Sequence, residues 1–434
     1  MTDVGNIAKI PELRKRLLFT LMMVAVYRLG IFIHTPWVNT EAVQNFLKQD
    51  TVFEIFKLFS GGALEQFSVF ALGIMPYISA SIIFQLLTVA VPSIERLSKE
   101  GDAGRRKITQ YTRYATVALS LIQGFGISYG LRQQGFVTPG IPALTFYCAT
   151  VFTLAAGTSF LMWVGEMITE RGIGNGISLI IFAGIIDRIP SGFRDAWQNK
   201  SQFGELFGFI ALLAGIALVI SVIIFMERSQ RRIPIQYAKR VVGRQLMGIQ
   251  ASHLPLKINS AGVIPPIFAS SLILFPATIA QFSSGNEIVG QIAGFLTQGW
   301  IHNALYVALI IFFTYFYTAV AFNPVDVSEN LKKMGGYVPG IRPGKSTSDY
   351  IDQILTRITL GGALYIAAVC VVPSLLGDQF GIPYSLVNTF GGTSLLIAVG
   401  VAMDTLAQIE SHLLSRHYEG FLGAKGGGRF RGRR

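Results

Sequence analysis

Charged residues and cysteines are both scarce in this chain of 434 residues. Only 14% of the residues are charged, 51% are hydrophobic, and the mean hydropathy is +0.50. So apolar a composition excludes an ordinary soluble enzyme and indicates a polytopic membrane protein. The only two cysteines, Cys148 and Cys370, fall in apolar segments of opposite halves. Their placement argues against a disulfide framework or a thiolate metal site.

Enzyme motifs are also missing. The chain has no His-Glu-x-x-His, Gly-x-Ser-x-Gly or Cys-x-x-Cys, the motifs typical of zinc proteases, α/β-hydrolases and redox or zinc sites. Residues 340–346 imitate a phosphate-binding loop but have one residue too few between the glycines, and Pro343 stiffens the turn. We therefore predict no catalytic residue, no cofactor and no metal site.

The apolar residues gather into runs long enough to cross about 30 Å of hydrocarbon. We predict an all-α protein with ten such spans, five in each half: 17–33, 75–91, 114–131, 146–167, 177–189, 207–226, 262–280, 304–322, 354–375 and 389–410. A glycine-rich apolar stretch at 60–74 is too short to cross and is predicted to be re-entrant.

Ionisable residues are nearly absent from these spans. The exceptions are Arg28, Asp404 and some end positions such as Glu166, Asp187 and Glu410. Transporters that move protons or ions keep such residues inside the membrane, so their scarcity argues against a coupled transporter. Asp404, near the end of the last span, is interpreted as a cap or a partner of a basic loop rather than a proton relay.

The net charge of +12 is unevenly distributed. Most lysines and arginines precede the first span, follow the even-numbered spans or lie in the tail, which by the positive-inside rule makes both termini cytoplasmic. The two longest cytoplasmic loops, 227–257 and 323–353, carry more basic residues than topology requires. They predict a docking surface for an anionic or acidic partner, such as ribosomal RNA or the acidic face of an ATPase.

A nonamer is repeated between the halves. Residues 73–81 read GIMPYISAS and residues 262–270 read GVIPPIFAS, sharing Gly, Pro, Ile, Ala and Ser in one register. Five spans per half make the second half inverted relative to the first, the architecture of membrane proteins with a site between their halves. Ile78 and Ile267 then start from opposite faces and can meet near the midplane. Periodicity alone is equally compatible with ordinary helix packing.

Longer motifs extend this pattern through the chain. They lie at 59–64, 70–81, 100–114, 168–178, 230–234, 237–240, 253–259, 338–344 and 391–397. With these motifs the chain resembles the SecY/Sec61-alpha family of protein-conducting channels over essentially its whole length. The resemblance implies a clamshell of two inverted halves, residues 1–190 and 207–410, followed by a basic cytoplasmic tail at 411–434.

The resemblance also implies roles for particular residues. A re-entrant plug helix would cover about 60–72 and include Gly61, Gly62, Leu64, Phe67, Phe70 and Leu72. The hydrophobic pore ring would comprise Ile78, Ile82, Ile181, Ile267 and Ile397, with Ile185 or Ile177 as alternatives to Ile181. A lateral gate between spans 2–3 and 7–8 would carry Ile83 and Phe275.

The implied function is to move unfolded preproteins across the bacterial inner membrane and membrane helices laterally into it. The expected partners are the SecE and SecG subunits, the motor ATPase SecA, the ribosome, preprotein signal sequences and lipids. Docking of SecA and the ribosome is expected at Lys239, Arg240, Arg244 and Arg342. For Arg342 the alternative is a partner within its own loop.

Two other function classes would require residues that the sequence does not display. A small-solute secondary transporter with inverted repeats would require a polar binding site at the midplane, which the sequence does not display. A lipid-embedded enzyme such as an intramembrane protease would need a catalytic dyad within a span, and no Ser–His or Asp–Asp pair is placed for one.

Overall fold

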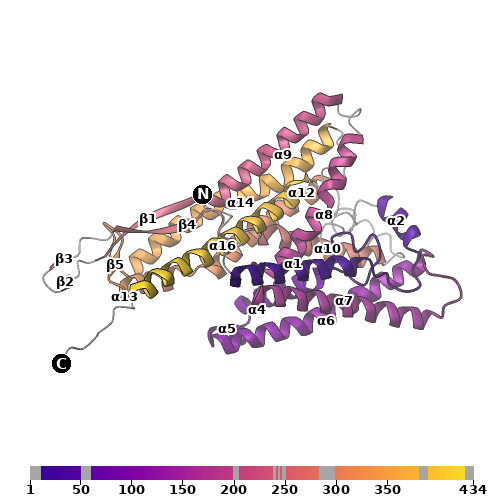
Figure 1. The fold of residues 1–434 in the computed structure, drawn as a ribbon, viewed down its shortest axis with the longest axis horizontal. Coiled ribbons are helices and arrows are strands. Elements are labelled where there is room, and N and C mark those ends of the chain that lie inside the picture. Colours follow the sequence, from indigo (N-terminus) through magenta and orange to yellow (C-terminus); the bar gives the residue numbers. More distant parts are fainter. Residues whose placement is uncertain are drawn as a thin grey trace.

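The computed structural model describes residues 11–49, 60–198, 205–237, 241–242, 245–246, 251–282, 299–380 and 390–425. Long helices make up most of this part of the chain (Figure 1). Each predicted span falls on one helix: α1 (Pro11–Ile31), α4 (Met75–Ala90), α6 (Asp102–Gln133), α7 (Ala143–Arg171), α8 (Gly176–Gln198), α9 (Glu205–Arg228), α10 (Ile264–Phe282), α12 (Gly299–Ala321), α14 (Lys345–Phe380) and α16 (Gly392–Lys425). The helical membrane fold is therefore confirmed.

Not all of these helices pass a stricter test of length and composition. Among the described residues, five runs are long and apolar enough to cross a membrane: α7, most of α8, α12 with the following α13 (Pro324–Lys333), most of α14, and the first part of α16. A sixth is formed if α4 and α5 (Pro92–Lys99), which bend by 98°, count as one broken span. The count of ten stays a prediction.

The bend between α4 and α5 has a local cause. Val91 precedes Pro92 and has extended backbone angles, φ −113° and ψ 111°. The ring of a proline disfavours the helical conformation in the residue before it, so α4 ends at Ala90. Pro92 then starts α5, because a proline is tolerated in the first turn of a helix, where its missing N–H has no partner to lose.

The helices pack mainly within their own half of the chain. In the first half α4 packs on α6 and α6 on α7, and α1 packs on α7 and α8; in the second half α10, α12, α14 and α16 pack in sequence, with α9 against α16. Figure 1 shows the first group from indigo to purple and the second from pink to yellow. The halves meet at two seams, α8 with α16, and α10 with both α4 and α6.

The repeated nonamer has the same local structure in both halves. Gly73 and Gly262 both have left-handed backbone angles, φ 57° and 62°, and each is followed within two residues by the start of a helix, α4 or α10. Glycine adopts this region without the steric cost that a Cβ imposes. The repeated nonamer therefore turns the chain into an apolar helix in the same way in each half.

The two basic loops fold against each other. Strand β1 (Gln230–Tyr237) pairs antiparallel with β4 (Ala251–Lys257) and, through Gln236 and Tyr337, with β5 (Gly336–Tyr337). A short hairpin, β2 (Val241–Val242) and β3 (Gln245–Leu246), lies between β1 and β4. The sheet, which the sequence analysis did not predict, covers a small core of Ile233, Ile235, Leu256, Leu331, Val338 and Ile351. The two loops thus form one unit with α13 and the start of α14.

We expect Gly262→Ala to lower the thermal unfolding midpoint in detergent. No atom lies within 4 Å of a Cβ at Gly262, so the left-handed backbone alone acts, at roughly 1–2 kcal/mol. The control is Gly215→Ala in α9, which is also open around its Cβ but is helical, where alanine is favoured by about 1 kcal/mol. An equal fall in both midpoints would contradict the role of the backbone at Gly262.

Candidate functional site

The predicted ring isoleucines lie together in one buried cluster. Ile78 and Ile82 come from α4, Ile181 from α8, Ile267 from α10 and Ile397 from α16. Their exposed fractions run only from 0% to 6%. Four helices from both halves therefore contribute to one apolar cluster, as a closed constriction between the halves would require. Their role as a pore ring stays a prediction.

The burial of Ile181, Ile185 and Ile177 indicates which of these α8 residues can belong to the ring. Ile185 is 2% exposed, as is Ile181, and belongs to the same cluster, whereas Ile177 is only partly buried at its edge. Ile181 and Ile185 are one helical turn apart and share a face. Both can therefore contribute to the constriction. The sequence analysis did not assign Ile74 and Met75, which are also buried in the cluster, although both lie within the repeated nonamer.

The segment expected to be a plug helix is not helical. Residues 61–74 run through successive turns, with an isolated bridge between Ser68 and His34. Gly61, Gly62 and Phe67 have positive φ, at 58°, 89° and 42°, and a right-handed helix requires negative φ. The expectation of a helix over 60–72 is therefore wrong for the described residues.

This 60–72 segment nevertheless occupies the interior. Phe70 and Ala63 join the isoleucine cluster, and Phe70 stacks on Phe160 of α7 with ring centroids 5.9 Å apart. Four further residues, Leu64, Phe67, Ala71 and Leu72, belong to a second buried cluster with Val43, Leu131, Phe146 and Leu154. The segment thus joins two apolar clusters and has no free apolar face of its own.

Close backbone approach fixes the segment between helices. A Cβ at Gly157 of α7 would overlap the carbonyl oxygen of Val69, and a Cβ at Gly61 would lie 2.8 Å from the Cα of Gly184 in α8. Glycine is needed where two backbones come this close. The predicted residues Gly61 and Gly62 therefore have separate uses, close packing at the first and a left-handed turn at the second.

Polar contacts hold the start of the segment. Tyr27 Oη of α1 donates to the carbonyl oxygen of Ser60 at 3.2 Å, and Arg28 Nη1 donates to that of Gly61 at 3.2 Å. Arg28 also forms an ion pair with Asp187 of α8. The neighbouring Arg188 pairs with Glu65 in the segment, Nη2 to Oε1 at 3.1 Å. The sequence singled out Arg28 and Asp187 as unusual charges, but only the fold brings them together.

The predicted lateral gate corresponds to the seam of α10 with α4 and α6. On α4, Ile83 is 44% exposed, next to the buried Ile82. Phe275 lies on α10, but its side chain is outside the described residues. The helices expected at the gate are therefore adjacent, and the two gate residues stay predictions.

The docking residues are only partly described. Lys239, Arg240 and Arg244 lie outside the described residues. Arg342 is exposed in a turn where Thr347 Oγ1 donates to its carbonyl oxygen at 2.9 Å. In the part of the chain that the structure describes, no ion pair involves Arg342, so the alternative of a partner in its own loop finds no support. Its guanidinium remains available to an external group.

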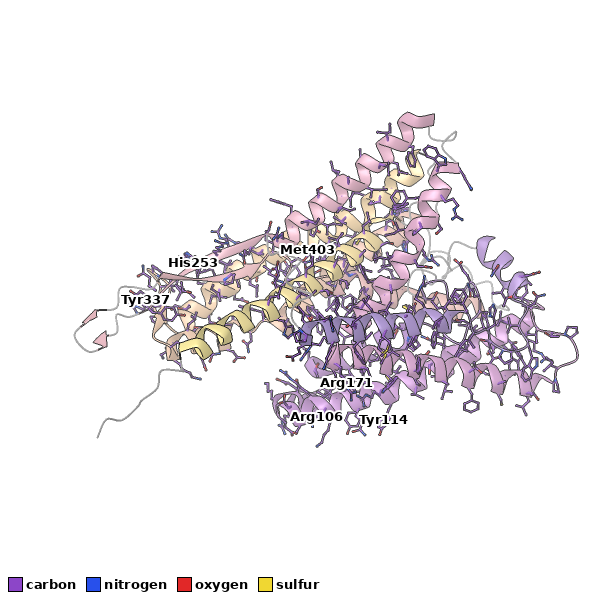
Figure 2. The ribbon with its side chains drawn as sticks, viewed as in Figure 1. Arg106, Tyr114, Arg171, His253, Tyr337 and Met403 are labelled. Atoms are coloured by element: carbon purple, nitrogen blue, oxygen red, sulfur yellow. The ribbon has the colours of Figure 1, made fainter. Side chains whose placement is uncertain are left out.

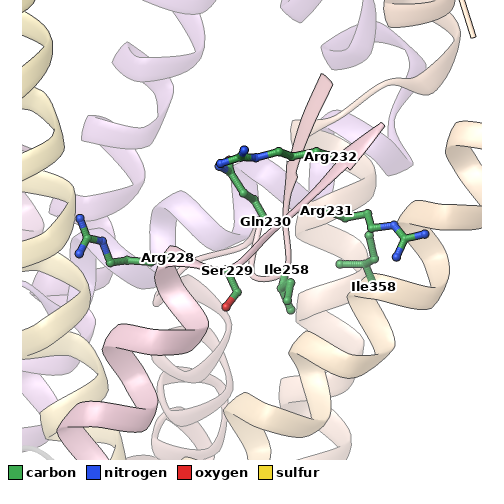
Figure 3. Close-up of a pocket in the computed structure, with 7 residues that line it drawn as sticks. All are labelled: Arg228, Ser229, Gln230, Arg231, Arg232, Ile258 and Ile358. Carbon is green, nitrogen blue, oxygen red and sulfur yellow. The ribbon is translucent and has the colours of Figure 1, made fainter. Parts of the chain in front are cut away.

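The sheet begins beside a shallow basic cavity of about 570 Å³ (Figure 3). Its lining includes Arg228 at the end of α9, Arg231 and Arg232 on β1, and Ile258 and Ile358. Figure 3 shows the three guanidinium groups well apart, with those of Arg228 and Arg232 extending to the left of the view and that of Arg231 to the right. They therefore form a broad cationic surface rather than a clamp on one anion.

Basic side chains also occur on the helices of the first half. Figure 2 labels Arg106 on α6 and Arg171 on α7 at the lower middle of the view, apart from His253 and Tyr337 of the sheet at the left. Among the described residues, no group of three or more His, Cys, Asp or Glu side chains is placed to hold a metal ion. The chemistry of the sheet-bearing end is therefore that of a charged surface.

Comparison with known proteins identifies the family. The SecY family model matches residues 68–406. The chain is 49% identical over 424 residues to the protein translocase subunit SecY of Escherichia coli K12, covering 95% of this chain and 94% of the relative. It is 48% identical over 419 residues to SecY of Pseudomonas aeruginosa, covering 95% and 93%.

Solved structures share the fold at low identity. A protein-conducting channel matches with a TM-score of 0.67 and 18% identity, and a SecY channel whose plug domain stabilises the closed state matches with 0.65 and 18%. Sec61 from a canine ribosome–channel complex matches with 0.63 and 17%. Each covers 96% of this chain and 98% of the other. On the family model and the close relatives, the chain belongs to the SecY family.

Proposed function

We propose that the buried isoleucines and the 60–72 segment close a channel for unfolded polypeptides between the two halves of the chain. The chain is a protein translocation channel subunit, as its family membership implies. The observation that carries the proposal is the single buried cluster to which α4, α8, α10, α16 and the 60–72 segment all contribute. Opening then requires that these contacts be exchanged for contacts with the translocating chain.

An isoleucine constriction suits this task. A narrow apolar opening loses its water and so blocks ions, yet its contacts are non-directional and accept chemically varied side chains. A small-solute transporter would need convergent polar groups at this place. The five predicted ring positions are all isoleucine, and the relatives that match almost the whole chain are protein translocase subunits, so a small-solute transporter is not favoured.

The membrane setting follows from charge. The chain is a multi-pass membrane protein, and its basic termini and loops support cytoplasmic ends in a bacterial inner membrane. Substrates would cross from the sheet-bearing end toward the 60–72 segment. Signal sequences and membrane helices would leave for the lipid through the seam of α10 with α4 and α6, past Ile83 and Phe275.

Energy would come from outside the chain, because we propose no catalytic site in it. The unit formed by the sheet and α13 would dock SecA or the ribosome through Arg342, Lys239, Arg240 and Arg244, with Arg231 and Arg232 extending the surface. Structural relatives described in ribosome complexes support a ribosome contact. SecE and SecG are proposed as further subunits in the membrane.

The first test is crosslinking from a photoreactive residue in place of Ile267. A stalled, signal-bearing preprotein in membranes supplied with SecA and ATP should crosslink at this position and at position 78. The matched control is position 122 of α6, where Ile122 is 62% exposed and should face lipid. Translocation without crosslinks at 267 and 78 would overturn the ring; no translocation at all would overturn the channel.

The seal itself is tested by Ile267→Asn. A buried polar side chain hydrates the constriction, because an amide retains water that isoleucine excludes. We expect a higher ion leak across proteoliposomes and export of preproteins with defective signal sequences. Ile122→Asn makes the same change on an exposed helix face and should alter neither readout. Unchanged leak and unchanged signal stringency in Ile267→Asn would contradict the proposal.

Docking is tested by Arg342→Glu. Reversing an exposed charge at an interface slows association and changes its salt dependence, so SecA-driven translocation should fall by roughly tenfold at low salt. The ion leak should stay at the wild-type level, because the residue is remote from the isoleucine cluster. Arg194→Glu, an exposed arginine on α8, is the control. An equal loss in both variants would mean that Arg342 has no specific docking role.

A further inference from the structure

The 60–72 segment is tied to its neighbours by charge as well as by apolar packing. Glu65 is the only charged residue between positions 60 and 74, and it pairs with Arg188 of α8. Since the rest of the segment is apolar or neutral, this carboxylate is the charged side chain through which the segment itself is attached. The attachment lies outside the isoleucine cluster and can act independently of it.

A second pair supports the same segment from α1. Arg28 binds the carbonyl oxygen of Gly61 and, at the same time, the carboxylate of Asp187. Asp187 and Arg188 are consecutive in α8, so one turn of this helix holds Arg28 through its acidic residue and Glu65 through its basic one. Helices α1 and α8 are thereby joined to both ends of residues 61–65.

We propose that these four residues, Arg28, Glu65, Asp187 and Arg188, are a polar latch that determines how readily the 60–72 segment leaves its place, and hence how stringently the channel selects signal sequences. This inference rests on the proposed channel function. The four residues position the segment and do not contact the constriction. A weak signal sequence supplies too little binding energy to break both apolar and polar contacts, whereas an effective one supplies enough for both.

The exposed fractions of the four side chains determine how much each ion pair contributes to holding the segment. Arg28 and Arg188 keep 26% and 19% of their side chains exposed, and the two carboxylates about half. Partly exposed ion pairs of this kind are weak, so loss of one pair should raise the opening equilibrium roughly two- to fivefold. That increase is far below what loss of the apolar seal would cause, and it leaves the channel functional.

The experiment compares Glu65→Gln, Arg188→Gln and the double variant in the full channel complex, by ion leak from proteoliposomes and by export of a preprotein with a defective signal. Each single variant should raise both readouts roughly two- to fivefold. The double variant should fall short of the product of the two singles, because the contact that the two residues share is lost only once. The Arg28→Gln, Glu65→Gln double variant should raise both readouts more than either of its two single variants does, because two separate attachments of the segment are lost.

The matched controls neutralise exposed charges that are not part of the latch. Glu41→Gln in α2 (Thr40–Gln49) and Arg194→Gln in α8 remove exposed charges that have no ion pair among the described residues, and should leave both readouts unchanged. Arg188→Lys keeps the charge and should stay close to wild type. If Arg188→Gln does not accumulate in membranes, Arg188→Lys takes its place and is compared with wild type and with Glu65→Gln.

Ile267→Asn separates the latch from the channel proposal. Leak in Ile267→Asn with wild-type behaviour of Glu65→Gln and Arg188→Gln would overturn the latch and leave the channel standing. Multiplying effects in the Glu65→Gln, Arg188→Gln double variant would also overturn it, because the two residues would then act separately. Failure of crosslinking and of leak at position 267 would count against the ring, whatever the latch variants show.

Discussion

The backbone of a chain in lipid must satisfy its hydrogen bonds internally, and the architecture depends on that constraint. Helices meet it by themselves, whereas irregular backbone is tolerated only where protein surrounds it. The 60–72 segment is irregular and lies among helices, and its ends are bonded accordingly: Thr35 N–H donates to Phe67 O at 3.0 Å and Val69 N–H to Ile33 O at 2.9 Å. With Tyr27 and Arg28 bonding Ser60 and Gly61, protein groups replace the helical bonds that this stretch lacks.

Apolar and polar contacts have different tasks in the proposed channel. Isoleucine side chains from both halves share one buried cluster; in the proposed closed state they would exclude water without selecting any particular partner, so a polypeptide of any sequence could replace them. Hydrogen bonds and ion pairs lie at the margin of the 60–72 segment, where they fix its position. A seal made of polar contacts would bind passing side chains selectively; a segment held by apolar contacts alone would have no defined orientation.

The sequence predicts elements that depend on local patterns and misses those that depend on distant ones. Apolar runs placed every span on a helix, and the repeated nonamer indicated the equivalent starts of α4 and α10 because a left-handed glycine and an early proline are local requirements. The sheet was missed because Pro234 and Pro255 argue against strands and β5 is about a hundred residues from β1. The sequence predicts a helix over 60–72 because apolar composition does not reveal the positive φ at Phe67. Likewise, burial identified Ile185 as an equal of Ile181, which spacing alone could not decide.

The two seams between the halves differ in chemistry, and this difference indicates which can open. Beside the α8–α16 seam, in the turn that precedes α8, Gly174 N–H donates to Gln408 Oε1 of α16 at 2.9 Å, and Ile173 packs with Leu13 of α1 and Ile409 of α16. At the other seam, the described side chains of α10 form no hydrogen bond or ion pair with α4 or α6. Separating that seam exposes apolar surface, which lipid or an apolar signal sequence covers at little cost, whereas separating the first would also break a hydrogen bond between the halves. This difference supports the proposal that the halves part at the α10 seam.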